Sequence, residues 1–256
     1  MEPPMNTLQM VILAKSYKPG GRCIAGKLVE LLDNKSANIG PWVRLVSNDK
    51  TGHGSINEEI YKYEDGQEAR VLDIVEIPIL GRVSVEGQPE NIVIDESKRW
   101  HKLSSLDAKS ISCITDNTDN IWLETGVQNN VVTALYDQKG LVTQSLFLIK
   151  PSNLFITLSN EYDNFKVKYK KKTKANFDYA NVCYKNLSVT CPAVRKIFNH
   201  KYPSEGGQPI TLKLIKGDDY FLCLSLGPRF GVNNYHHKLV ATIFDFDGYL
   251  QKNYIA

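Results

Sequence analysis

The sequence predicts a mainly β protein made of two small antiparallel barrels with few short helices. Two observations lead to this prediction. Segments rich in Val, Ile and Leu, for example VLDIVEIPILGRV at 71–83, are separated by turn residues along the whole chain of 256 residues. In addition, no long amphipathic helices alternate with these segments, which disfavours a doubly wound parallel sheet.

The first half of the chain contains five strand-like segments. Pro, Gly and Asn residues lie between them, notably at 18–21, 38–41 and 139–140, where they favour turns. A short helix is expected within Asp95–Ser110. The predicted strands of this half cover residues 8–15, 22–32, 41–47, 71–83 and 141–149.

The second half shows the same pattern of strand-like segments separated by turns, and it adds the clearest predicted helix, Pro192–His200. Pro192 suits the first helical position, and Thr190 or Cys191 would cap the helix. The predicted strands of this half cover residues 153–159, 164–172, 180–189, 209–215, 220–227 and 237–246.

Charge is divided unequally along the chain. Pro151-Ser152 is the expected seam between a domain of residues 1–150 and a domain of residues 151–256. The first of these segments carries a net charge of −4 and the second a net charge of +7. This contrast indicates that the C-terminal half contacts a polyanion, or at least a different partner from the first half.

The sequence carries no signal for export or for a membrane partner. Its N-terminal segment has an acidic residue and no long apolar core, and no segment is apolar over the ~20 residues that span a bilayer. The five cysteines are odd in number, widely spaced and without a CxxC pair, as is typical of reduced thiols. We therefore expect a cytoplasmic protein.

No cofactor or metal site is predicted. The five histidines are scattered, and His236 and His237, as neighbours on a strand, would point to opposite faces. The segment AKSYKPGGRCIAG at 14–26 lacks the GxxxxGK[ST] spacing of a P-loop, and a strand-like segment follows it where a P-loop needs a helix. It is predicted to be a hairpin turn, whose charges are either solvated or face a nucleic-acid backbone.

The strongest local signal is the lysine-rich segment NFKVKYKKKTK at 164–174. It holds six lysines and no acidic residue, and Phe165, Val167 and Tyr169 alternate with the first three lysines. On a strand this alternation makes one face basic and the other apolar or aromatic. Lysines beside stacking aromatics are typical of single-stranded nucleic-acid binding, and lysines also protect edge strands from aggregation. Both interpretations remain open.

Several segments in order along the chain resemble the bacterial dual OB-domain (tandem OB-fold) proteins. Two positions depart from the family pattern: Cys191 stands where Asp is expected, and His237 stands where Tyr is expected. The basic run is also longer than the pattern requires. The segments that carry the resemblance are ILAKSYKPGGRCIAG at 12–26, GPWVRLVS at 40–47, VLDIVEIPI at 71–79, QPENIVID at 88–95, YKNLSVTCP at 184–192, YFLCLSLGPRF at 220–230 and YHHKLVATIF at 235–244.

The resemblance implies two OB-like barrels in a bacterial conflict or anti-phage system. OB barrels bind strands across a sheet face and its flanking loops, through basic and stacking residues. On that basis the candidate nucleic-acid-binding residues are Lys15, Ser16, Lys18, Arg22, Trp42, Arg44, Lys166, Lys168, Tyr169, Lys170 and Lys172. A further polar cluster, for which a pocket is one interpretation, comprises Gln88, Glu90, Asn91 and His236.

Three functions are compatible with these features. The first is non-catalytic binding of single-stranded DNA or RNA by a module of an anti-phage system. The second is a protein-interaction adaptor whose acidic first half docks a genomically neighbouring effector protein. The third is an enzyme acting on nucleotides or modified bases, which would need Lys15, Glu90, Asn91 and His236 to meet in one pocket.

Overall fold

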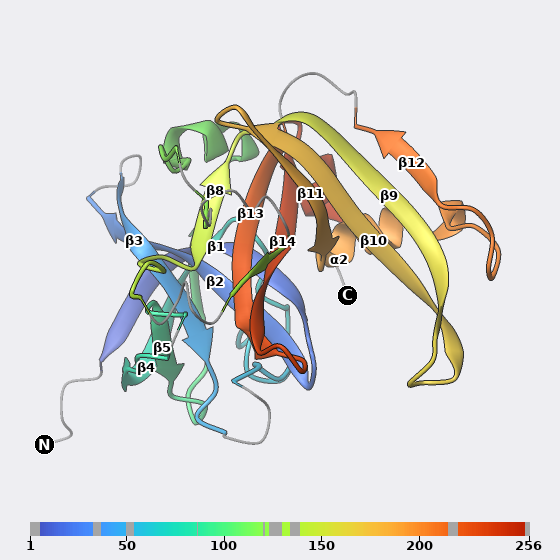
Figure 1. The fold of residues 1–256 in the computed structure, drawn as a ribbon. Helices are drawn as coiled ribbons and strands as arrows, with labels where there is room; N and C mark the ends of the chain where they lie inside the picture. Colours follow the sequence, from blue (N-terminus) through green and yellow to red (C-terminus); the bar gives the residue numbers. More distant parts are fainter. Residues whose placement is uncertain are drawn as a thin grey trace, which may run out of the picture.

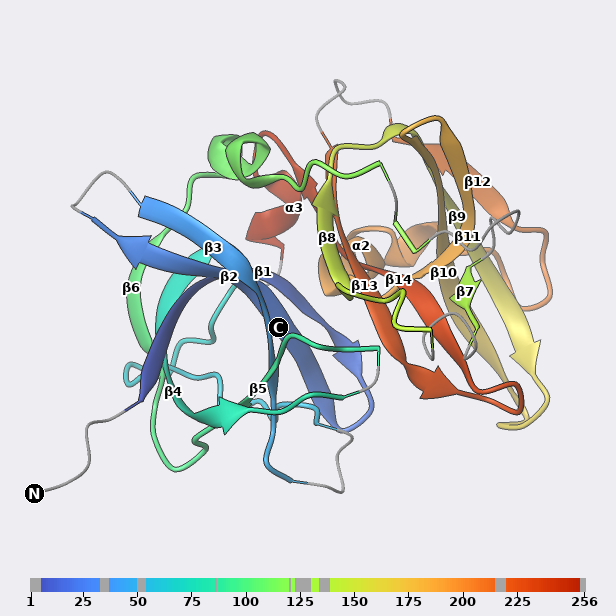
Figure 2. The same cartoon turned by 60° about the vertical axis from the view of Figure 1, so that its left-hand side comes forward.

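The computed structural model is dominated by β-strands arranged in two sheets that lie side by side (Figures 1 and 2). The predicted mainly β class is confirmed. The structure describes residues 6–32, 37–49, 54–85, 87–119, 121–122, 130–133, 139–214 and 220–253.

The first sheet closes into a five-stranded barrel. Its strands follow the order β1-β2-β3-β5-β4, and β4 pairs back onto β1 to complete the ring. Neighbouring strands are antiparallel except for the parallel pair β3 and β5, and a sixth strand extends the sheet beside β4. The strands are β1 (Thr7–Lys18), β2 (Gly21–Leu31), β3 (Ala37–Val46), β4 (Asp73–Arg82), β5 (Asn91–Ile94) and β6 (His101–Ser105).

The second sheet repeats this strand order without closing. Five of its strands follow β9-β10-β11-β14-β13, with β11 and β14 as the parallel pair, whereas β12 and β8 form its two edges. The second predicted barrel is therefore an open sheet with the strand order of the first barrel. The strands are β7 (Val131–Val132), β8 (Leu146–Ile149), β9 (Ser152–Asp163), β10 (Lys168–Tyr179), β11 (Val182–Val189), β12 (Ile210–Lys213), β13 (Tyr220–Phe230) and β14 (Tyr235–Asp245).

Two predictions about helices have different outcomes. The helix expected at 192–200 is confirmed, with Pro192 at its first turn and Cys191 at its N-cap. The helix expected within Asp95–Ser110 is wrong for most of that range, because residues 101–105 pair with β4, and only the 3-10 helix η1, which begins at Ala108, overlaps its end. The helices are η1 (Ala108–Ile114), α2 (Pro192–Ile197), η2 (Asn199–Lys201) and α3 (Tyr249–Lys252).

Strand β8 connects the two predicted domains. It precedes Pro151 in the sequence, yet Leu146–Ile149 pair with β13 of the second sheet. The second sheet therefore includes chain from before the expected seam, and the boundary between residues 150 and 151 stays a prediction.

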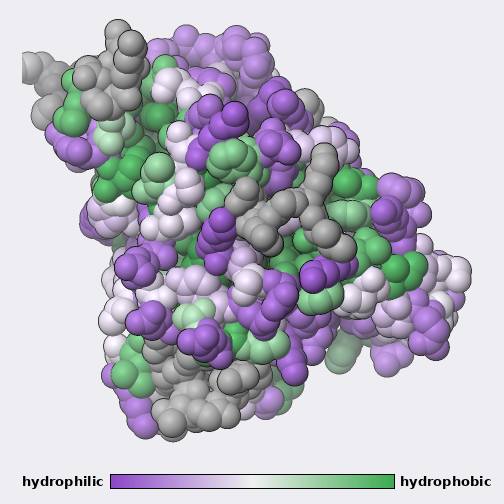
Figure 3. Space-filling view, turned by 90° about the horizontal axis from the view of Figure 1, so that it is seen from above, coloured by the Kyte–Doolittle hydropathy of each residue, from purple (hydrophilic) through white to green (hydrophobic). Residues whose placement is uncertain are grey.

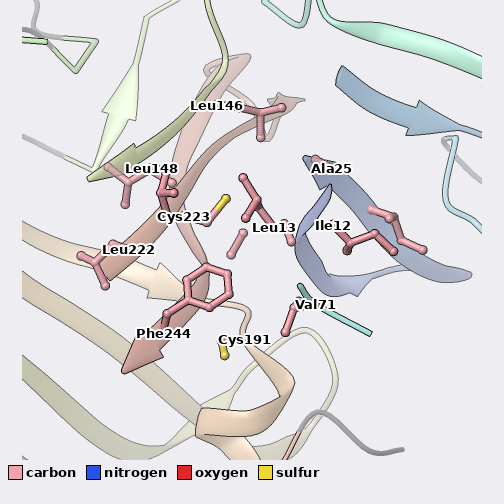
Figure 4. Packing of buried hydrophobic residues seen from close by; sticks show 14 of the residues in the cluster. Ile12, Leu13, Ala25, Val71, Leu146, Leu148, Cys191, Leu222, Cys223 and Phe244 are labelled. Atoms are coloured by element: carbon pink, nitrogen blue, oxygen red, sulfur yellow. The ribbon is translucent and has the colours of Figure 1, made fainter. Parts of the chain in front are cut away.

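A single hydrophobic core extends through both sheets. Strand β1 is buried without interruption from Met10 to Ser16, because one face lines the first barrel and the other packs on the second sheet. Figure 4 shows Leu13 of β1 lying between Ala25 of the first barrel and Cys223 of the second sheet. Burying one such leucine contributes about 1.5–3 kcal/mol, so this packing holds the two sheets together.

None of the described helices is long and apolar enough to cross a membrane. All five cysteines are free thiols, of which Cys191 and Cys223 are buried in the core and Cys113 is exposed.

Candidate nucleic-acid interface

The hairpin of β9 and β10 ends in a two-stranded arm, which we define as Glu161–Lys170. Strand β11 pairs with β10 only from Lys174 onward, and β12 pairs with β9 only up to Leu158. Within the described residues, no further strand therefore lines the arm. Figure 1 shows the arm (yellow) projecting beyond β12 and α2 at the edge of the molecule.

Four lysines of β10 lie on one face of this hairpin. Lys168, Lys170, Lys172 and Lys174 alternate along the strand, so their side chains share the face opposite the core. We call these four residues the lysine face. Lys168 and Lys170 are exposed and form no ion pair in the part of the chain that the structure describes. Their charges are therefore available to an anionic ligand.

Two acidic residues of β9 lie opposite these lysines, and both are already engaged. Glu161 forms an ion pair of 2.6 Å with Lys172, and hydrogen bonds from Lys172 and Ser159 lower the pKa of Glu161. Asp163 accepts hydrogen bonds from the backbone N–H groups of Phe165 and Lys166, which lowers its pKa. Both carboxylates are thus ionised at neutral pH, and Asp163 fixes the turn of the arm.

The opposite face of the arm is aromatic. Tyr162 and Tyr169 meet edge to face, with ring centroids 5.3 Å apart. Lys171 also lies on this side, where its Nζ donates to Asn199 Oδ1 at 2.9 Å and lies over the Tyr202 ring. The structure therefore places Lys166, Lys168, Lys170 and Lys172 together with Tyr169 on one hairpin, but Tyr169 faces away from the lysine face.

Sequence reasoning did not single out the two acidic residues of β9. The sequence does contain a signal for Asp163. An Asp at the start of a turn typically accepts hydrogen bonds from backbone N–H groups of the same turn. Glu161 carried none, since its contact with Lys172 depends on the register of β9 and β10.

The candidate residues of the β1–β2 hairpin are largely buried. Lys15 is 2% exposed, pairs with Glu68 at 2.5 Å and lies over the Tyr61 ring, and burial lowers its pKa. Ser16 is also buried. Burial also lowers the pKa of Lys18.

Only the end of that hairpin keeps basic groups near the surface. Arg22 lies over the Tyr17 ring at 4.3 Å, and Arg195 of α2 lies over the same ring at 5.1 Å. Tyr17 is 46% exposed, and its N–H donates to the Thr190 carbonyl. These contacts join β1 to the second sheet and leave Lys18 and Arg22 partly exposed.

Trp42 and Arg44 face the second sheet rather than solvent. The Trp42 Nε1–H donates to Asp116 Oδ2 at 2.9 Å, and Lys27 donates to Asp116 Oδ1 at 2.7 Å. Asp116 Oδ2 also accepts from the Leu148 N–H of β8. Because Trp42 is 5% and Arg44 2% exposed, neither side chain offers a surface to a nucleic-acid strand.

Arg44 is the centre of a buried hydrogen-bond network between the sheets. Its guanidinium donates to Ser145 Oγ at 2.8 Å and to Ser225 Oγ at 3.2 Å, both in or beside the second sheet. Ser145 Oγ in turn donates to Glu90 Oε2 at 2.7 Å, and Glu90 Oε1 accepts from the Ser145 N–H. We call Arg44, Glu90, Ser145 and Ser225 the inter-sheet network.

The predicted polar cluster lies around this network. Gln88 Nε2 donates to the Leu226 carbonyl at 2.9 Å, and His236 Nδ1 lies 2.8 Å from the Gly227 carbonyl oxygen. Asn91 is 3% exposed. Gly87 has a φ of +72°, and a Cβ there would lie 2.4 Å from the His236 ring, so only glycine fits this approach.

The cluster therefore joins the sheets. The buried residues are Gln88, Glu90, Asn91 and His236, whereas Lys15 pairs with Glu68 elsewhere.

A cavity of about 430 Å³ lies outside this cluster. Its lining residues include Asp116, Trp122 and Phe147. Among the described residues, no group of three His, Cys, Asp or Glu side chains is placed to hold a metal ion.

Comparison with known proteins shows the family of the chain. A search of curated proteins finds no match. The model of one family, the Dual OB-containing domain, matches residues 8–243, which includes the closed barrel and nearly all of the second sheet. The chain therefore belongs to the Dual OB-containing domain family.

Proposed function

We propose that the chain binds single-stranded nucleic acid, without catalysis, through the lysine face. The observation that carries this proposal is the pair Lys168 and Lys170, which are exposed, form no ion pair among the described residues, and lie on a strand that projects from the body. Lysines at this spacing neutralise successive phosphates of a nucleic-acid backbone.

The family and the charge distribution support the same ligand. OB folds commonly bind oligonucleotides across a sheet face, and the segment from residue 151 onward carries a net charge of +7. We further propose that the chain serves a bacterial anti-phage or conflict system, on the basis of its resemblance to such proteins. The efficiency of phage plating on hosts with and without the gene tests that setting.

Binding is tested by fluorescence anisotropy with labelled single-stranded DNA, single-stranded RNA and duplex DNA at about 50 mM and about 200 mM salt. With three to four phosphate contacts, we expect affinity for a single strand to fall roughly 20- to 50-fold between the two conditions, because bound counterions are released. The absence of binding to any polymer at the lower salt concentration would contradict the proposal and favour the adaptor function.

A further inference from the structure

The tip of the arm exposes an unusual concentration of apolar surface. Phe165 is 100% and Val167 73% exposed, and Tyr162 and Tyr169 just behind them are 49% and 38% exposed. Single exposed apolar residues are common, but such groups mark interaction sites. On the face seen from above, hydrophobic residues lie in groups among hydrophilic ones (Figure 3).

Hydrogen bonds fix the backbone of the turn that carries Phe165. Both N–H groups that follow Asn164 bond to Asp163 Oδ1, at 3.1 and 3.2 Å. Val167 adopts a φ of +51°, which a β-branched residue adopts only with strain. Asn or Gly would fit this position without strain, so the sequence keeps an apolar side chain here at an energetic cost.

A second hairpin tip, between β13 and β14, provides a comparison. Phe230 is 75% and Val232 104% exposed there, so the two tips present similar apolar residues. They differ in the amount of positive charge, because three lysines, Lys166, Lys168 and Lys170, lie within five residues of Phe165, whereas Arg229 is the one Lys or Arg within five residues of Phe230. Of these two tips, the arm therefore attracts a polyanion more strongly.

We propose that Phe165 inserts between neighbouring bases of the nucleic acid whose backbone the lysine face holds. This inference rests on the proposed function and adds a contact to it. Proteins that bend or unstack nucleic acids insert apolar side chains between base steps, and aromatic rings stack with bases of any sequence. Phe165 contacts nothing within the arm that would compete with a base, since its side chain is fully exposed.

The test uses oligonucleotides with 2-aminopurine, whose fluorescence rises when the base is unstacked from its neighbours. Single-stranded and duplex forms are titrated with the wild-type chain, Phe165→Ala, Phe165→Trp and the matched control Phe230→Ala. We expect Phe165→Ala to abolish the fluorescence rise and to weaken binding about tenfold, the effect of one lost stacked base. Phe165→Trp and Phe230→Ala should behave as wild type, and the salt dependence should persist in every variant.

A rise with the single strand assigns Phe165 to stacking along a flexible strand, and a rise with the duplex assigns it to a wedge in a base step; both support the inference. Wild-type affinity and fluorescence in Phe165→Ala would overturn it, as would an equal loss in Phe230→Ala. Phe165-dependent binding to anionic lipid vesicles, with unchanged nucleic-acid binding, would also overturn it. Failure of the proposed function gives a different result from failure of this inference, because the wild-type chain would then bind no nucleic acid.

Discussion

The double variant Lys168→Glu, Lys170→Glu is expected to bind single-stranded nucleic acid at least about 30-fold more weakly than wild type at 0.1 M salt. Each lost phosphate contact costs on the order of fivefold at that concentration, and the new carboxylates repel the backbone. The magnitude of the slope of log affinity against log salt should also fall by about 1.4. Both values follow from anisotropy titrations at several salt concentrations.

The matched control is Lys98→Glu, Lys109→Glu, which makes the same change in net charge on exposed residues of the first half. If the lysine face binds the strand, this control should lose only a small fraction of the affinity. An equal loss in both variants would mean that net charge alone drives binding, and would contradict the placement of the site. Thermal melts should show both variants folded, since the changed side chains are exposed.

Arg44→Ala is expected to lower the free energy of unfolding by about 3 kcal/mol or more, and the Tm by roughly 6–12 °C. The change removes a side chain that is 2% exposed and leaves the hydroxyl groups of Ser145 and Ser225 without the hydrogen bonds that Arg44 donates to them. Buried polar groups that lose a partner carry their full desolvation cost. Urea unfolding and calorimetry measure the effect.

Arg82→Ala is the control for this prediction, because Arg82 lies on β4 of the same barrel and is exposed. Its free energy of unfolding should stay within about 0.5 kcal/mol of wild type. A loss below about 1 kcal/mol in Arg44→Ala would mean that the inter-sheet network does not hold the sheets together, and that the hydrophobic contact around Leu13 suffices.

The strands could be predicted because their signal is local. Apolar segments separated by turn residues predict β1, β2, β4, β9, β11, β13 and β14, and Pro192 predicts α2. The strand expected at 164–172 is only partly correct, because residues 164–167 form a turn and β10 covers Lys168–Tyr179. The sequence does not predict the edge strand β6. Its five residues are all exposed in the structure, so its sequence lacks the alternation of apolar and polar residues that marks a half-buried strand. Closure of one sheet and not the other depends on pairing between distant segments, which no local pattern encodes.

Part of the candidate site could also be predicted from the local sequence. The alternating lysines of β10 define a face from neighbouring residues alone, and the structure places them together. Arg44 and Lys15 look like surface cations in the sequence, but their partners come from remote segments: Ser145 is 101 residues away from Arg44, and Glu68 is 53 away from Lys15. Their burial is a property of the assembled sheets.

The most direct measurement for the central claim is lysine footprinting. The chain is acetylated with and without a saturating single-stranded oligonucleotide, and mass spectrometry gives the modification rate at each lysine. We predict that the oligonucleotide slows modification of Lys168 and Lys170 severalfold and leaves Lys98 and Lys109 unchanged. Unchanged rates at Lys168 and Lys170, or equal protection of all four residues, would contradict binding through the lysine face.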